Sequence, residues 1–92
     1  MEPITIKVTK EDIKKGRQEN IKYCPIALAL KRNFKTNMVE VSQDHETDQI
    51  ILQIDDDQYD YDQCDNYNDM FCFVQKFDSG LMVEPFTFKI NI

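Results

Sequence analysis

The sequence predicts a single α+β domain over residues 1–92, built as a βαββαβ unit. Four stretches alternate apolar and polar residues, as half-buried strands do. Two others carry apolar residues three or four positions apart, as amphipathic helices do. One sheet with both helices on one face would bury all of these stripes, and the element order is that of a ferredoxin-like sheet with the first and third strands central. The order of strands in the sheet is left open.

A strand and a short helix are expected in the first 16 residues. Residues 4–8, ITIKV, alternate in the manner of a strand. Thr9 precedes Asp12 by three positions, the spacing of a capping box, and Gly16 is a residue that commonly ends helices. The sequence therefore predicts a short helix over KEDIKKG.

A longer helix is expected to begin at CPIALAL. Pro25 suits the first helical position, because its missing N–H would be unpaired there and its φ is already set. Ile26, Ala27, Leu30 and Phe34 fall along one face, which predicts a helix of about ten residues.

The middle of the chain predicts two strands joined by the turn QDHETD. Residues 38–42, MVEVS, place Val39 and Val41 inward and Glu40 outward. Residues 50–54 repeat the alternation with isoleucine and leucine at the inward positions.

The last third predicts a helix and a closing strand. The helix begins near Asn66, with Asp69 placed to complete its cap, and Gly80 ends it. Its apolar stripe is Tyr67, Met70, Phe71, Phe73, Val74 and Phe77. The final strand is PFTFKINI, whose alternate apolar residues run to Ile92.

Charge is distributed unevenly along the chain. The net charge is −6, yet residues 1–35 carry nine Lys/Arg and four acids, whereas residues 36–75 carry eleven acids and no Lys or Arg. Residues 76–92 balance. Such asymmetry steers charged partners, and it disfavours contact of the acidic part with nucleic acid or anionic lipid.

The densest acidic stretch, QIDDDQYDYDQCDNYNDM, is predicted to bind a partner protein. A calcium loop starting at Asp55 fails, because Asp60 stands where glycine is required and Asn66 where a bidentate glutamate is required. A solvated loop is the simpler alternative. Tyrosines interleaved with the aspartates favour an interface, since tyrosine adds contact area at low entropic cost. The predicted partner-binding residues are Asp55, Asp56, Asp57, Tyr59, Asp60, Tyr61, Asp62 and Asp65.

A second hypothesis places a nucleotide signal on the basic first third of an oligomeric protein. KKGRQENIKYCP leads into a helix N-terminus, where phosphate binds favourably. The alternative ligand-binding residues are Lys14, Lys15, Arg17, Lys22, Lys31 and Arg32.

Other functional classes find little support in the sequence. The expected outward residues of the central strands include no aromatic, unlike those of RNA-binding sheets of this topology. One histidine, and no Walker or G-x-S-x-G motif, argue against an enzyme. Three cysteines without C-x-x-C spacing argue against a disulfide framework and a structural zinc site. We expect no cofactor and no metal. Cys72 is expected in the core, Cys24 buried near a helix cap and Cys64 exposed.

The chain resembles a group of small, uncharacterised bacteriophage proteins. The matching segments are ITIKVTKEDIKKG, CPIALAL and FVQKFDSGLMVEPFTF, the last following the pattern FVxxFDxGxxVxPFxF, and they cover about half of the chain. The resemblance implies a small phage protein in a bacterial cytoplasm, and such proteins often bind a host factor, as anti-CRISPR inhibitors do. The N-terminus MEPITIKVTK lacks the pattern of a signal peptide, which also predicts the cytoplasm.

The leading hypothesis is therefore a non-enzymatic, DNA-mimicking acidic protein that inhibits a host protein, such as an anti-phage defence protein, through a basic surface on that partner. Neither direct nucleic-acid binding nor membrane association is expected. The alternatives are the oligomeric nucleotide-binding protein and a minor structural phage protein.

Overall fold

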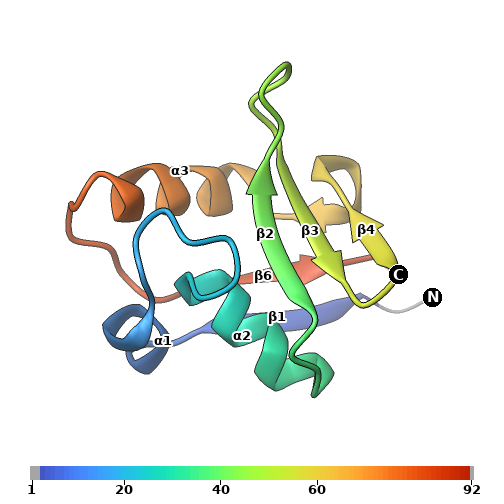
Figure 1. Ribbon diagram of the computed structural model, residues 1–92, viewed down its shortest axis with the longest axis horizontal. Coiled ribbons are helices and arrows are strands. Elements are labelled where there is room, and N and C mark those ends of the chain that lie inside the picture. Colours follow the sequence, from blue (N-terminus) through green and yellow to red (C-terminus); the bar gives the residue numbers. More distant parts are fainter. Residues whose placement is uncertain (1–2, 92) are drawn as a thin grey trace.

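Within residues 3–91, two antiparallel three-stranded sheets and three α-helices make up the fold (Figure 1). The computed structural model describes residues 3–91, except for the side chain of Tyr61. Within this range the elements follow in the order β1 (Ile4–Val8), α1 (Lys10–Lys15), α2 (Pro25–Phe34), β2 (Val39–Gln43), β3 (Ile50–Ile54), β4 (Asp57–Tyr59), the 3₁₀ turn η1 (Tyr61–Gln63), β5 (Cys64–Asp65), α3 (Tyr67–Asp78) and β6 (Phe86–Ile90). The α+β class predicted from the sequence is confirmed.

The first sheet joins the two ends of the chain in the order β1-β6-β5. β6 lies in the middle and pairs along its length with β1, from Ile4 opposite Ile90 to Val8 opposite Phe86. β5 pairs with the other edge of β6. The alternating apolar side chains of β1 and β6 turn inward, as the period of two predicts. Ile92, expected at the end of the last strand, lies outside the described residues.

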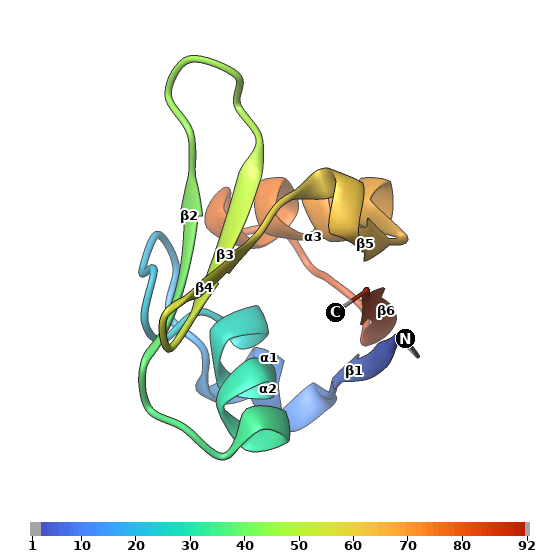
Figure 2. The ribbon, with the colours of Figure 1, turned by 90° about the vertical axis from the view of Figure 1, so that its right-hand side faces the viewer.

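The second sheet is a meander in the order β2-β3-β4. β2 and β3 form the predicted hairpin, which projects beyond the rest of the molecule at the top of Figure 2. β3 turns directly into β4 through Asp55 and Asp56, since Ile54 pairs with Asp57. Asp55 has a φ of 52°. Aspartate enters this left-handed region more readily than most residues, which favours it in so tight a turn.

The core lies between the two sheets, and α2 and α3 close it (Figure 2). α2 packs against both β1 and β2 and so connects the sheets, whereas α3 packs on β6. Ile26 and Leu30 of α2 and Met70 of α3 have no exposed surface. Burial of each such side chain stabilises the fold by about 1.5–3 kcal/mol. None of the helices within residues 3–91 is long and apolar enough to cross a membrane.

The predicted capping box of α1 is confirmed. Asp12 accepts a hydrogen bond from the Thr9 amide at 2.9 Å, and the Asp12 amide donates to Thr9 Oγ1 at 3.2 Å. Gly16 ends the helix where the chain passes very close to the start of α2: a Cβ at Gly16 would lie 2.6 Å from the ring of Pro25. A residue without a side chain is needed at this crossing.

The predicted cap of α3 is wrong. Asn66 occupies the N-cap position, but α3 has no side-chain capping hydrogen bond from the described residues. Asn66 has a φ of 63°, because the chain must turn sharply from β5 into the helix. Its side chain instead donates to the carbonyl oxygen of Thr87 in β6 at 3.0 Å. Gly80 ends the helical region with a φ of 81°, as a helix-terminating glycine commonly does.

The single ferredoxin-like sheet is also wrong. The first strand is an edge of one sheet, and the third strand is the centre of the other. The reason lies in residues 55–65 of the acidic stretch, in which no strand was predicted but which supply β4 to the second sheet and β5 to the first. Each sheet thereby gains a third strand, and the chain crosses from one sheet to the other within residues 60–63.

Candidate functional site

The acidic residues 55–65, which we call the acidic segment, lie on one side of the molecule. Figure 2 shows the chain from β4 to β5 crossing that side, and β4 and β5 there are edge strands of the two sheets. Asp55 and Asp56 form the turn before β4. Asp60 directly precedes η1, and Asp62 lies within it. The structure therefore presents a dense run of carboxylates along the path that connects the two sheets.

Two buried side chains fix the acidic segment to the core. Tyr59 retains 8% of its surface and Cys64 retains 7%. Between them, the Asp62 amide donates to Asp60 Oδ1 at 3.1 Å, and the amide of Asn91 donates to the carbonyl oxygen of Gln63 at 2.7 Å. These bonds hold η1 against the end of β6. The acidic segment is thus an ordered surface, and a solvated loop does not describe it.

The carboxylates of the acidic segment point outward. Five of the six predicted aspartates are exposed, and Asp60 is partly buried. Asp55 accepts a hydrogen bond from Thr36 Oγ1 at 2.6 Å. Exposure keeps the charged form of these groups hydrated while leaving their oxygen atoms accessible to a partner.

None of these carboxylates forms an ion pair among the described residues. The two ion pairs found within residues 3–91 join Lys15 to Glu11 and Arg32 to Asp12, so neither involves the acidic segment. The strand register places Lys89 opposite Asp65 at the end of β5, which is the nearest counterpart along the sheet. Most of the negative charge is therefore left for solvent, ions or a partner.

Tyr59 does not provide the contact area that we expected of it. Its ring is buried where β4 pairs Tyr59 with Leu52 of β3. Burial raises the pKa of Tyr59, and the neighbouring Asp57 carboxylate raises it further. The strand register explains the placement, because Tyr59 lies directly opposite Leu52, a residue of β3 with no exposed surface. The side chain of Tyr61, the other tyrosine predicted to contact the partner, lies outside the part of the chain that the structure describes.

The basic residues of the second hypothesis do not converge on a helix N-terminus. Lys31 and Arg32 lie in the last turn of α2, at the far end from its N-terminus. Arg32 pairs with Asp12, and Lys31 Nζ lies 4.0 Å from the ring centroid of Tyr23. Lys15 pairs with Glu11. Lys14 lies in the last turn of α1, and Arg17 and Lys22 are exposed in the loop that follows the helix.

The N-terminus of α2 is itself occupied. Cys24 is the N-cap, and its Sγ accepts a hydrogen bond from the amide of Ala27 at 3.4 Å. Pro25 has no N–H to offer. Burial raises the pKa of Cys24, and the Asp78 carboxylate also raises it, so the thiol stays protonated despite the helix dipole. A phosphate at this helix end would have to displace the hydrogen bond from Ala27 to Cys24, and the Asp78 carboxylate would repel it.

The other cysteines are placed opposite to expectation. Cys64 is buried and Cys72 is exposed. Cys72 lies between Phe71 and Phe73, but the inward stripe of α3 passes through Met70 and Phe73 and leaves it outside. No group of three or more His, Cys, Asp or Glu side chains among the described residues is arranged to hold a metal ion.

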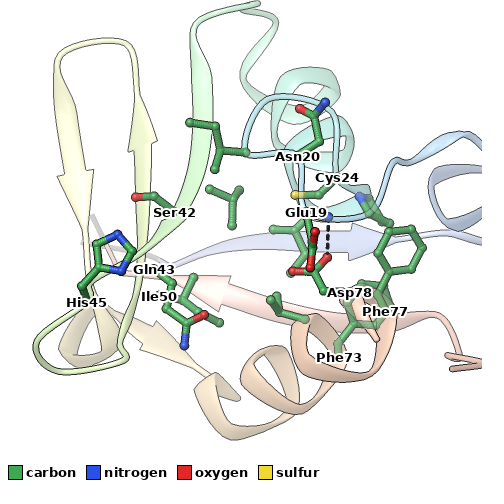
Figure 3. Close-up of a pocket in the computed structure, with 15 residues that line it drawn as sticks. Glu19, Asn20, Cys24, Ser42, Gln43, His45, Ile50, Phe73, Phe77 and Asp78 are labelled. Carbon is green, nitrogen blue, oxygen red and sulfur yellow. Dashed lines mark hydrogen bonds between the residues drawn. The ribbon is translucent and has the colours of Figure 1, made fainter. Parts of the chain in front are cut away.

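A cavity of about 470 Å³ lies on another part of the surface, and sequence reasoning did not anticipate it. Figure 3 shows it between the loop that precedes α2, the β2–β3 hairpin and the end of α3. Its lining includes the apolar residues Ile26, Val41 and Phe73. Glu19 and Asp78 lie next to each other on one side (Figure 3). Residues 17–23 show no periodicity in the sequence, so no pattern pointed to a wall there.

No protein-family model matches the chain, and no curated protein or solved structure shows significant similarity to it. The features that bear on function are therefore the charge of the acidic segment and the geometry of the cavity.

Proposed function

We propose that this chain is a non-enzymatic binding protein whose acidic segment docks on a basic surface of a partner protein. The observation that carries the proposal is the run of exposed carboxylates at residues 55–65, held in place by buried anchors and outside both ion pairs of the described chain. An array of exposed carboxylates without ion-pair partners among the described residues suits a partner whose own surface is positively charged.

The partner class that we propose is a host protein that normally binds nucleic acid. Double-stranded DNA presents a dense row of phosphate charges, which basic grooves are built to neutralise. Asp55, Asp56 and Asp57 are consecutive, and Asp60, Asp62 and Asp65 follow within eight residues of Asp57. Carboxylates at this density imitate the charge of a phosphate row. The resemblance to small bacteriophage proteins adds the context of a phage inhibiting its host, including a defence protein.

Electrostatic docking makes salt dependence the first property to test. Contacts among exposed charges weaken as salt screens them beyond a Debye length of about 8 Å at physiological ionic strength. Tagged protein would be incubated with nuclease-treated bacterial lysate at low and at high salt, and bound proteins identified by mass spectrometry. We expect a partner with a basic nucleic-acid-binding surface that is released at high salt.

A variant that lacks part of the charge of the acidic segment tests whether docking depends on this segment or only on the negative net charge of the protein. The variant removes four exposed carboxylates that accept no hydrogen bond from the described residues, by replacing aspartate with asparagine at Asp56, Asp57, Asp62 and Asp65. The net charge falls in magnitude from −6 to −2. We expect this variant to lose the partner while keeping its fold, because the anchors Tyr59 and Cys64 are untouched.

A matched control carries the same charge change elsewhere. Its four substitutions are Glu46→Gln, Asp48→Asn, Asp69→Asn and Glu84→Gln, all at exposed positions outside the acidic segment. The control should retain the partner. Equal capture by both variants, or a partner that resists high salt, would contradict the proposal, and so would the absence of any specific partner.

A further inference from the structure

The cavity beside α2 has preformed walls. One wall is formed by Glu19, Asn20 and Ile21, which belong to the loop of residues 17–23. This loop is tied to two other elements. The amide of Val41 in β2 donates to the carbonyl oxygen of Ile21 at 2.7 Å, and Gln18 Nε2 donates to the carbonyl oxygen of Phe77 at 3.1 Å. Within the loop, Asn20 Oδ1 accepts from the amides of Lys22 and Tyr23, each at 3.0 Å. The loop therefore stands as a fixed wall and does not have to close around a ligand.

Apolar side chains from four parts of the chain line the interior. Ile26 comes from α2, Val41 from β2, Ile50 from β3, and Phe73 and Phe77 from α3. The first four are buried, and Phe77 is partly exposed toward the opening. A volume of about 470 Å³ falls within the range of small-molecule sites, which are mostly apolar with a few placed polar groups.

Two carboxylates meet on one side of this apolar interior. Asp78 Oδ1 accepts the backbone N–H of Glu19 at 2.9 Å, and Figure 3 shows the two acidic side chains next to each other. Glu19 has a φ of 52°, a region that glutamate rarely adopts, so the local structure holds it there against a backbone cost. Two like charges side by side repel, and a cation between them relieves that repulsion.

No lysine or arginine is among the residues that line the cavity. The two helix ends at the cavity offset each other: the N-terminus of α2 carries about half a positive charge, and the C-terminus of α3 about half a negative one. His45 also lines the cavity, but it lies on the β2–β3 hairpin, away from Glu19 and Asp78 (Figure 3), so these two carboxylates set the charge at their own end of the cavity. An anionic ligand is disfavoured, which also separates this cavity from a phosphate site.

We propose that the cavity binds a small organic cation with an apolar body, such as an arylalkyl ammonium compound. The ammonium lies at Asp78 and Glu19, and the apolar body covers Ile26, Val41 and Phe73. The site shares no residue with the acidic segment, so it is a second binding function independent of partner docking.

The test uses three probes of similar size that differ in charge: 2-phenylethylammonium, 2-phenylethanol and 3-phenylpropanoate. Binding to the full chain would be followed by NMR of the methyl groups of Val41, Ile50 and Val74, which line the cavity. We expect the ammonium compound to shift these resonances saturably, the alcohol to bind more weakly and the carboxylate not to bind. Absence of ammonium binding, or equal affinity for all three probes, would overturn the proposal.

Variants that remove a negative charge test whether Asp78 and Glu19 cause the preference for the ammonium compound. Asp78→Asn keeps an oxygen that accepts the Glu19 amide, so the loop retains its anchor while the charge is removed. We expect on the order of fivefold weaker ammonium binding with little change for the alcohol. Glu19→Gln should act in the same direction, and the distant exposed change Glu84→Gln should have no effect. Unchanged ammonium affinity in the Asp78→Asn Glu19→Gln double variant would also overturn the proposal.

Discussion

Arg32 binds Asp12 through two parallel hydrogen bonds across twenty residues of chain: Nη1 lies 2.7 Å from Oδ1, and Nη2 lies 3.0 Å from Oδ2. The same guanidinium donates to the carbonyl oxygen of Lys7 at 2.9 Å. One side chain of α2 thus holds the cap of α1 and the end of β1. Arg32 therefore has a structural role, and a ligand could bind its guanidinium only if these hydrogen bonds broke.

Arg32→Met should destabilise the protein by about 2 kcal/mol at neutral pH, because Asp12 is 4% exposed and would be left without its charged partner. Burial alone would raise the pKa of Asp12, but the hydrogen bonds from Arg32 and Thr9 outweigh it and hold that pKa below its usual 3.8. A carboxylate with a lowered pKa stabilises the fold above pH 3.8, and its contribution is lost as pH falls below that value.

Urea unfolding of the wild type and Arg32→Met at several pH values measures this effect. The stability difference should be constant near neutral pH and shrink as pH falls below 3.8. Lys14→Met, in the same region but with an exposed side chain outside both ion pairs of the described residues, is the control and should change stability little. A difference that persists undiminished in acid would contradict the role given to the pair.

Tyr59→Ala should destabilise the protein by about 3 kcal/mol, since it removes an aromatic ring from the core where β4 meets β3. Tyr59→Phe retains the ring and should cost less than about 1.5 kcal/mol. Thermal or urea unfolding compares the two. If Tyr59→Ala left stability unchanged but abolished partner capture, Tyr59 would be a contact residue after all.

Asp55→Gly should be more stable than Asp55→Ala by about 1 kcal/mol. Both variants lose the hydrogen bond from Thr36, but a φ of 52° is unfavourable for alanine and not for glycine. Unfolding of the two variants in urea measures the difference directly. Equal stability, or a more stable alanine variant, would show that this turn is not left-handed in solution.

Only Cys72 should react rapidly with a thiol reagent in the native state. It is exposed, whereas Cys24 is partly buried, with a pKa raised by that burial, and Cys64 is buried. Burial raises the pKa of Cys64 to about 11, with Asp60 and Asp65 adding to the effect. Thiolate, the reactive form, is therefore scarce at mildly basic pH.

The reaction would be followed by absorbance with and without urea. One fast thiol is expected in the native protein, none in Cys72→Ser, and all three cysteines should react in the unfolded chain. Fast reaction of Cys64 in native protein would contradict its place in β5 against β6.

Elements with local signals were predictable from the sequence. The alternation of residues 4–8, the spacing from Thr9 to Asp12, and Pro25 before an apolar face each specify their element through neighbours a few positions away. Strands β4 and β5 carry no such signal. They are three and two residues long and rich in aspartate, which has low strand propensity, and they form because distant strands offer them an edge.

The candidate sites divide in the same way. The acidic segment could be identified from the sequence, because its six aspartates lie within eleven consecutive residues, 55–65. The burial of Tyr59 depends on the register that pairs it with Leu52, which a single sequence does not reveal. The cavity depends on a loop held by bonds such as that from Glu19 to Asp78, 59 residues apart, and no local pattern encodes such a contact.

The central claim is that the acidic segment, and not acidity in general, binds the partner. The most direct measurement is the dissociation constant of the captured partner for the wild type, the four-residue variant of the acidic segment and the matched control, at low and high ionic strength. If each carboxylate contributes about 0.5 kcal/mol, the first variant should bind about 30-fold more weakly at low salt. The control should bind like the wild type, and high salt should reduce the difference. Equal affinities for the two variants would contradict the claim.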